Sequence, residues 1–249
     1  MVVLKTASEI QTMMHACKIS AQALKLAGEA VKPGVTTEDI DALIYDFILS
    51  PGAKPSFLHY GGFPKSACIS INDEIIHGIP SKKTVIKSGD IVSVDVGASI
   101  DGFHGDNAYT FPAGEISDEA KKLLEVTKQS LYKAIEKAVA GARVGDLGSA
   151  VQTYVEENGF SVVREYVGHG VGRNLHEDPE IPNFGKAGRG MRLLPGMTIA
   201  IEPMVNAGNY AVKRLGDGWT VVTADHSLSA HFEHTIAITT GSPVILTQP

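Results

Sequence analysis

The chain has 249 residues, of which 43% are hydrophobic and 20% are charged, a composition typical of a globular protein with a substantial core. A formal net charge of −6, with Lys and Arg scattered along the chain, argues against nucleic-acid binding. The two cysteines, Cys17 and Cys68, are too few for a disulfide framework, which indicates a reducing compartment. No apolar stretch approaches the ~18 residues of a membrane span. We therefore expect a single domain (residues 1–249) in the cytoplasm.

The first half is expected to contain two helices followed by strands. A capping-box pattern at Thr6 and Glu9, with apolar residues at helical spacing behind it, predicts a helix that ends at Pro33-Gly34. A second helix should run from about residue 36 to residue 50. Strands are expected near 67–72, 91–97 and 103–111, the last two forming a hairpin about Asp101-Gly102.

The second half shows the same order of elements. Ser117 is expected to cap a long helix ending at Gly141, and Asp146 to cap a shorter helix ending at Gly159. Strands are expected near 160–167, 197–203, 219–223 and 229–239.

The spacing of glycines indicates an internal repeat. Gly34 and Gly89 lie 55 residues apart, as do Gly141 and Gly196, and an acidic residue follows six positions after the second glycine of each pair. We therefore expect an α/β fold of two pseudo-twofold-related halves, approximately 6–111 and 117–239, around one mainly antiparallel curved sheet. Two unrelated helix-plus-strand units are the alternative.

Four acidic residues lie in or beside apolar strands, where an unpaired carboxylate would cost several kcal/mol. Asp95 and Asp106 should share one face of the hairpin, because side chains alternate along a strand and a two-residue turn at 100–101 or 101–102 keeps their parity. Glu202 ends "TIAIE" and Glu233 lies in "SAHFEHTIAIT", and neither strand offers a Lys or Arg as a partner.

An imidazole joins these acids to suggest a metal centre. His169 lies between two glycines in "YVGHGVGR", which leave its ring uncrowded. Two divalent cations would neutralise four carboxylates, whereas one would leave two negative charges in a low-dielectric site. Oxygen ligands suit Mg²⁺, Ca²⁺ or Mn²⁺, and the imidazole shifts the preference towards Mn, Fe, Co or Zn. The hypothesis is a dinuclear site, with ions ~3.5–4 Å apart and a bridging water as nucleophile.

The motifs around these residues resemble those of the type I methionine aminopeptidases. They are "DVGASIDGFHGD", "GHGVGR", "IEPM" and "FEHT", with further similarity in "KSACISINDEIIHGIP" (65–80) and "HEDP" (176–179), so the resemblance covers essentially the whole chain. It implies the pita-bread fold and hydrolysis of the N-terminal methionine from nascent polypeptides and peptides, with a preference for a small second residue. It also implies two divalent transition-metal ions, with Co, Mn, Fe, Zn and Ni as candidates.

The same resemblance assigns roles to individual residues. Glu202 would act as general base, His77 would contact the substrate near its scissile amide, and His176 would hydrogen-bond the carbonyl oxygen. The metal ligands would be Asp95, Asp106, His169, Glu202 and Glu233, and the apolar pocket for the methionine side chain would be walled by Tyr60, Phe63, Cys68 and Trp219.

Two residues depart from the family pattern. Leu175, beside His176, stands where an aromatic residue is expected. His231 stands where Gln is usual, and it shares parity with Glu233, so it should face the metal site. Asn72 and Ser229 match positions that help to hold a monovalent cation in relatives.

Other functions fit the sequence less well. Prolidase and aminopeptidase P use the same five ligands on this fold but usually carry a large extra N-terminal domain, and type II methionine aminopeptidases insert a helical segment that the 33 residues from His169 to Glu202 cannot hold. A glycosidase would need only two acids, and a non-catalytic binding protein of this fold would not need all five ligands. The expected partners are nascent chains at the ribosome, with no nucleic acid or membrane, and the protein is expected to be a monomer.

Overall fold

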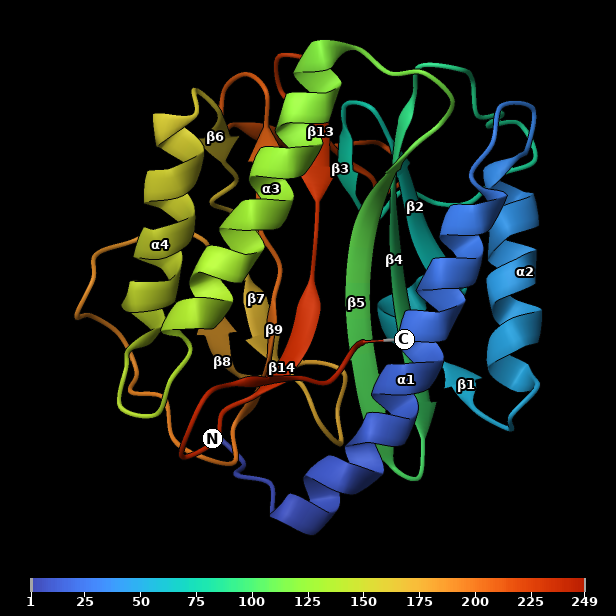
Figure 1. Cartoon of the computed structure of the whole chain (residues 1–249). Helices are drawn as coiled ribbons and strands as arrows, with labels where there is room; N and C mark the ends of the chain where they lie inside the picture. The colour runs from blue at the N-terminus through green and yellow to red at the C-terminus, as the bar shows by residue number, and fades with distance from the viewer. Residues whose placement is uncertain (1, 249) are drawn as a thin grey trace.

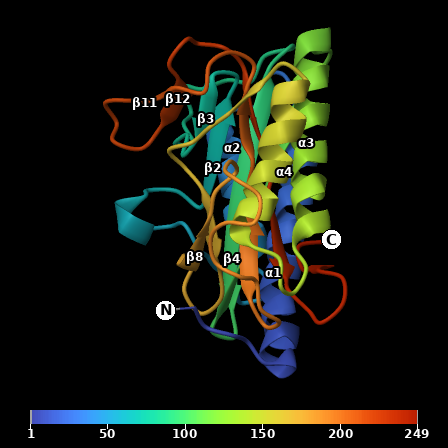
Figure 2. The ribbon, with the colours of Figure 1, turned by 90° about the vertical axis from the view of Figure 1, so that its left-hand side faces the viewer.

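The computed structural model describes residues 2–248 and places the α-helices of that range on one side of the strands (Figures 1 and 2). On the other side, Figure 2 shows β11, β12 and the blue-green segment around residue 60 projecting outward. The helices are α1 (Ala7–Ala30), α2 (Thr37–Leu49), α3 (Asp118–Lys137) and α4 (Val144–Glu157), with a short 3₁₀ helix, η1, at Tyr60–Gly62.

Within residues 2–248 the strands pair in an antiparallel manner and form four hydrogen-bonded sheets. In the first half these strands are β1 (Lys54–Pro55), β2 (Ala67–Ile71), β3 (Glu74–Ile76), β4 (Ile91–Ile100) and β5 (Phe103–Pro112). In the second half they are β6 (Ser161–Val162), β7 (Gly168–Gly170), β8 (Glu177–Ile181), β9 (Thr198–Ile201), β10 (Met204–Asn206), β11 (Val212–Arg214), β12 (Val221–Thr223), β13 (Ser229–His231), β14 (His234–Ala237) and β15 (Val244–Ile245). The sheets are β1-β4-β2 with β5 on β4, β13-β10-β6, β11-β12-β3, and β15-β14-β9-β7-β8.

The hairpin of β4 and β5 forms as predicted. Ile100 pairs with Phe103, so the turn consists of Asp101 and Gly102, which have φ values of 55° and 76°. Two consecutive positive φ values are the geometry of a type I′ turn, for which Asp-Gly is a favoured pair. Asp106 pairs with Gly97, two residues from Asp95, so both aspartates lie on one face of the sheet.

Several predicted boundaries in the second half are wrong. The strand expected near 160–167 is only β6 (Ser161–Val162), and α3 ends at Lys137, before Gly141. Asp146 does not cap α4: Arg143 occupies the N-cap position, and Asp146 lies in the first turn, where its carboxylate accepts a hydrogen bond of 2.7 Å from the Arg143 backbone N–H. The strand expected over 229–239 is interrupted at Phe232–Glu233, which separates β13 from β14. There the Glu233 backbone N–H donates instead to Ala108 of β5, at 2.9 Å.

Each pair of helices covers the strands of its own half. Apolar side chains of α1 and α2 pack against those of β4 that point away from Asp95, namely Val92, Val94, Val96 and Ala98. A second core joins α3 and α4 to strands of the second half. The apolar face of the hairpin is therefore buried under helices, while its acidic face is turned to the helix-free side.

Backbone contacts support the predicted internal repeat, which stays a prediction. The Gly34 N–H donates to the Ile86 carbonyl and the Gly141 N–H to the Leu193 carbonyl, so each bond spans 52 residues. Both glycines have left-handed backbones, with φ values of 93° and 91°. These positions favour glycine in both halves for the same physical reason.

The close packing of α1 on β5 requires a glycine at position 105, and we expect Gly105→Ala to destabilise the protein. An added Cβ would lie 2.4 Å from the Cys17 Cα, an atom of the α1 backbone that cannot move aside cheaply. Overpacking of this kind costs about 1–3 kcal/mol, or roughly 2–12 °C in melting temperature for a chain of this size. Thermal unfolding of the metal-free variant measures the effect. Gly216→Ala is the matched control, because nothing lies within 4 Å of its added Cβ, and equal melting temperatures for the two variants would contradict the packing argument.

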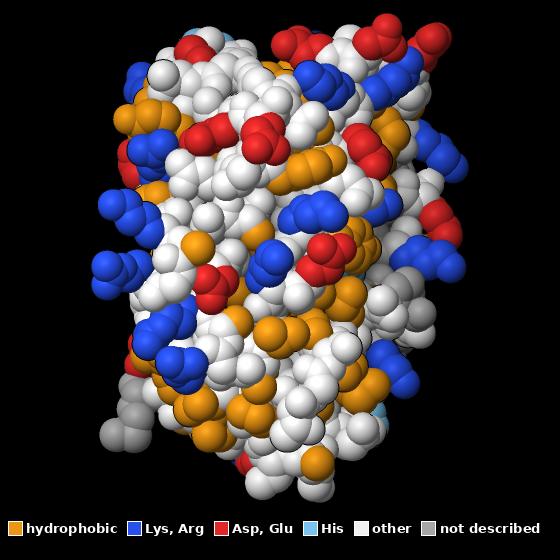
Figure 3. Space-filling view, turned by 60° about the vertical axis from the view of Figure 1, so that its left-hand side comes forward, with side chains coloured by type: hydrophobic (Ala, Val, Ile, Leu, Met, Phe, Trp, Pro, Cys, Tyr) orange, Lys and Arg blue, Asp and Glu red, His pale blue; other side chains and the backbone are white. Residues whose placement is uncertain are grey.

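The surface in Figure 3 carries Lys and Arg side chains interspersed with Asp and Glu, without one large area of either sign on the face shown. This mixture agrees with the scattered charges of the sequence. None of the helices in residues 2–248 combines the length and hydropathy needed to cross a membrane.

Candidate active site

The structure brings the five predicted metal ligands to one cavity. Asp95 and Asp106 come from β4 and β5, and His169 from β7. Glu202 follows β9, and Glu233 lies between β13 and β14. All five line a cavity of 180 Å³. Long-range contacts hold the two halves together here, since the Thr235 hydroxyl donates to the Asp106 carbonyl at 2.7 Å.

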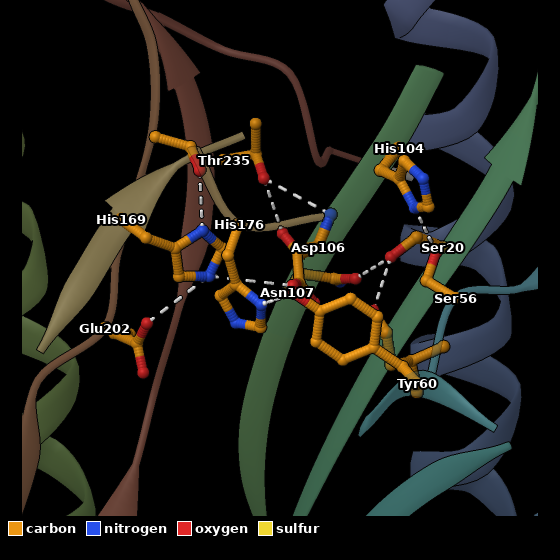
Figure 4. Close-up of polar contacts among 12 residues, drawn as sticks. Ser20, Ser56, Tyr60, His104, Asp106, Asn107, His169, His176, Glu202 and Thr235 are labelled. Atoms are coloured by element: carbon orange, nitrogen blue, oxygen red, sulfur yellow. Dashed lines mark hydrogen bonds and ion pairs between the residues drawn. The ribbon is translucent and has the colours of Figure 1, made fainter. Parts of the chain in front are cut away.

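His169 lies between two of the carboxylates (Figure 4). Its Nε2 is 3.6 Å from Glu202 Oε1 and 3.8 Å from Asp106 Oδ2, too far for hydrogen bonds. Its Nδ1–H donates to the Gly170 carbonyl at 2.8 Å, which leaves Nε2 free to accept. A backbone carbonyl holding the other ring nitrogen is the arrangement typical of metal-binding histidines.

Burial strongly perturbs the acids of this cluster. It raises the pKa of Asp95, Glu202 and Glu233 well above the usual range, and nearby carboxylates add to the effect. Burial also raises the pKa of Asp106 to about 7. In residues 2–248 the ion-pair partners of these carboxylates are histidines, not Lys or Arg. The cluster therefore lacks the positive charge that would make four buried carboxylates stable as anions.

The unpaired atoms of the cluster fit divalent cations. Asp95 Oδ1, Asp106 Oδ1 and Glu233 Oε1 are buried without hydrogen-bond partners in the described part of the chain. One ligand atom each from Asp106, His169 and Glu233 lie within 4.8 Å of one another. Buried polar atoms without partners are rare in proteins, and a bound cation would satisfy these oxygens.

Metal affinity at this site is expected to rise with pH between 6 and 8. The raised pKa values, including that of Asp106 at about 7, mean that the metal-free cluster holds protons in this range, which a cation must displace. His169 releases none, because burial lowers its pKa to about 3 and its ring is already neutral. Titration calorimetry with Co²⁺ at pH 6, 7 and 8 measures the metal affinity. Repeating the titrations in buffers of different ionisation enthalpy measures the number of protons released on binding. A constant affinity without proton release would contradict this account of the cluster.

The two further histidines predicted to act on the substrate also line the cavity. His176 lies beside His169, with ring centroids 4.2 Å apart, and its Nδ1 is 2.8 Å from the Tyr60 hydroxyl (Figure 4). His77 follows β3 with a left-handed backbone, and its ring meets Tyr166 edge-on. Burial lowers the pKa of His77 to about 4, so its ring is neutral at pH 7.

The apolar wall of the cavity contains every residue predicted for it. Tyr60, Phe63, Cys68 and Trp219 all line the cavity. Burial raises the pKa of the Cys68 thiol well above its usual range, so the thiol stays protonated and presents a small apolar surface to the cavity. Phe57 also lines this wall and was missed, because a phenylalanine beside a short strand carries no sequence signal for a pocket.

Leu175 and His231, the two residues that depart from the family pattern, lie at the site as expected: Leu175 in the apolar wall and His231 facing Glu202. Leu175 is 2% exposed and packs with Phe57, Phe63 and Cys68, so an aliphatic side chain completes the apolar wall. The His231 Nε2 is 3.7 Å from Glu202 Oε2, which agrees with the expectation that it faces the site. Asn72 and Ser229 are adjacent, since the Ser229 N–H donates to the Asn72 carbonyl at 2.8 Å. A monovalent cation there stays a prediction.

Comparison with known proteins identifies the family. The model of metallopeptidase family M24 matches residues 11–240. The chain belongs to this family. It is 55% identical to methionine aminopeptidase of Clostridium acetobutylicum over 99% of both chains, and 53% identical to methionine aminopeptidase 1 of Bacillus subtilis over the full length of both. The resemblance to methionine aminopeptidases is therefore confirmed.

Solved structures confirm the pita-bread fold of this M24 chain. The crystal structure of methionine aminopeptidase from Thermotoga maritima has a TM-score of 0.98 at 48% identity, with complete coverage of both chains. Prolidase from Pyrococcus furiosus has a TM-score of 0.81 at 25% identity and matches 99% of this chain but only 66% of its own. Family membership also establishes the coarser form of the cofactor prediction, namely divalent metal ions.

Proposed function

We propose that this M24 chain is a methionine aminopeptidase, which hydrolyses the bond after an N-terminal methionine in polypeptides and peptides. The observation that carries the proposal is that one cavity of 180 Å³ combines the acid–imidazole cluster with an apolar wall. The thioether side chain of a substrate methionine suits such a wall. With that side chain on the wall, the carbonyl group of the same methionine would face the cluster. Relatives named methionine aminopeptidase, alike over their full length, support the assignment.

The cluster supplies the groups that hydrolysis needs. Asp95, Asp106, His169, Glu202 and Glu233 would hold two divalent cations, which when bound activate water and polarise a carbonyl group. Glu202 accepts a proton from the attacking water and passes it to the nitrogen of the leaving peptide. The Glu202 carboxylate lines the cavity beside the other four acid and imidazole groups, so a water bound there is within its reach.

The neighbouring histidines orient the substrate and stabilise charge. If the Tyr60 hydroxyl donates to His176 Nδ1, the ring proton is on Nε2 and can be donated to the carbonyl oxygen as negative charge develops there. His77, on the same cavity, contacts the scissile amide. The apolar wall excludes water from one side of the reacting group, which strengthens these interactions.

The finer features of the proposal follow the family resemblance. The second residue of the substrate would be small, the substrates would be nascent chains at the ribosome, and the enzyme would act as a monomer in the cytoplasm. The full-length match to methionine aminopeptidases supports nascent polypeptide N-termini as the substrate. A proline-directed peptidase of the same fold is the second candidate, supported by the likeness to prolidase.

A comparison of two peptides tests the function. Metal-stripped and metal-replete protein are incubated with Met-Ala-Ser and Ala-Pro-Ser, and the released amino acids are quantified. Methionine release that depends on metal is the expected result. Cleavage confined to Ala-Pro-Ser would transfer the assignment to the prolidase type, and no cleavage of either would favour a binding protein.

A further inference from the structure

His231 is a buried imidazole that the mechanism above does not use. It ends β13 and is 1% exposed. Thr110 holds its backbone from both sides, since the His231 N–H donates to Thr110 Oγ1 and that hydroxyl donates to the His231 carbonyl, each at 2.9 Å. The side-chain Nε2 is buried and has no hydrogen-bond partner within residues 2–248. A well-anchored residue thus presents an unpaired nitrogen to the site.

The carboxylate that this nitrogen faces is Glu202. His231 Nε2 lies 3.7 Å from Glu202 Oε2, while His169 Nε2 lies 3.6 Å from Oε1, so an imidazole flanks each oxygen. Pairing of β13 with β10 aligns His231 with Met204, two residues beyond Glu202, which explains the approach. The Glu202 carbonyl is also anchored, because Asn183 Nδ2 donates to it at 2.9 Å.

An unpaired buried N–H is costly, and Glu202 is the group that can satisfy it. Leaving such a donor without a partner costs about 1–3 kcal/mol. A neutral imidazole carries a single N–H, and on Nε2 that hydrogen faces a carboxylate oxygen 3.7 Å away. A side-chain movement of under about 1 Å would bring the 3.7 Å separation to an ordinary N–H···O distance of about 2.9 Å.

We propose that His231 is a positioning residue whose Nε2–H holds Glu202 Oε2 and so orients the carboxylate that serves as ligand and base. This proposal rests on the function proposed above, since the roles of Glu202 come from it. Hydrogen-bond partners of metal ligands fix ligand orientation, and their loss typically costs about 10–100-fold in metal affinity or activity.

Three variants separate hydrogen-bond donation from shape. His231→Leu keeps an apolar side chain in the space but removes the N–H, whereas His231→Gln restores an N–H donor on a side chain of similar reach. His15→Gln is the matched control, because it removes an imidazole that is 64% exposed on α1. Co²⁺ alone is titrated into each metal-free protein, and its binding and visible absorption spectrum are recorded. Initial rates with Met-Ala-Ser then separate kcat from KM.

The expected result is that His231→Leu weakens Co²⁺ binding by about 10–100-fold, changes the Co²⁺ spectrum and lowers kcat by a similar factor, with KM little changed. His231→Gln should recover the spectrum and lie within about threefold of the parent, and His15→Gln should match the parent. If His231→Leu does not fold, as judged by near-ultraviolet circular dichroism, His231→Asn replaces it, because its amide is too short to reach Glu202.

Two outcomes would overturn the proposal. A folded His231→Leu protein with unchanged Co²⁺ affinity and spectrum would show that the nitrogen does nothing for Glu202. A His231→Gln protein as impaired as His231→Leu would show that the imidazole itself is required, as for a direct metal ligand. The Co²⁺ titration needs no peptide, so these outcomes are independent of methionine release. A parent protein that binds Co²⁺ but releases no methionine would refute the proposed function alone.

Discussion

Asp106→Asn is expected to abolish metal-dependent methionine release while making the metal-free protein more stable at pH 8. The first effect follows because Asp106 belongs to the trio of ligand atoms within 4.8 Å. Metal ions supply several kcal/mol of transition-state stabilisation, so the rate should fall by about 10³-fold or more. The variant should also lose the rise in melting temperature that Co²⁺ produces in the parent.

The size of the stability effect depends on pH. The pKa of Asp106 is raised to about 7 in the folded protein, above its unfolded value, so the folded state binds more protons and loses stability as pH rises through this range. The neutral Asn side chain avoids that loss. The metal-free variant should therefore melt above the metal-free parent at pH 8, and the difference should shrink towards pH 5.

Asp101→Asn is the matched control for this experiment. It removes a carboxylate from the turn of the same hairpin, where the side chain is 50% exposed and Asn tolerates the left-handed backbone. Metal binding and activity should stay at parental levels. Retention of Co²⁺ binding by Asp106→Asn would contradict its role as a metal ligand. A lower melting temperature of the metal-free variant at pH 8 would contradict the raised pKa of Asp106.

His176→Ala is expected to lower kcat by about 10²–10³-fold, the usual effect of removing one donor to a developing oxyanion. The metal content should not change, because His176 contacts the His169 ring and the Tyr60 hydroxyl and is not one of the five proposed ligands. Elemental analysis of the metal-loaded variant, together with kcat and KM for Met-Ala-Ser, measures both effects.

His15→Ala controls for the loss of a histidine outside the cavity and should leave kcat at the parental level. Loss of metal from His176→Ala would mean that this residue belongs to the metal centre. An unchanged kcat would remove His176 from the catalytic groups.

Local features of the sequence were sufficient to predict the β4–β5 hairpin and the shared face of its two aspartates. Asp101-Gly102 favours a type I′ turn, and alternation along β4 and β5 then places Asp95 and Asp106 on one face. Helix ends were less predictable. Asp146 has the residue type of an N-cap, but Arg143 takes that position, because an acid in the first turn can bond back to the N-cap N–H.

Long-range contacts determined what the sequence pattern could not show. The pattern over 229–239 reads as one strand, yet the chain breaks at Glu233, whose backbone bonds to Ala108 of β5. That break depends on a partner more than a hundred residues away. Phe57 entered the pocket for a similar reason, since its position depends on how the segment after β1 packs against Leu175 and Phe63.

The sequence by itself determined the identity of the acids and histidines, the turn that pairs two of the acids, and the motifs that resemble methionine aminopeptidases. These features are local, and alternation or residue type is enough to establish them. Only the tertiary structure decided that β5, β7, β9 and the break before β14 meet at one cavity. Among the described residues, 2–248, it alone left three carboxylate oxygens of the cluster and the His231 nitrogen without partners, because burial and distance arise from packing between segments that are far apart in the chain.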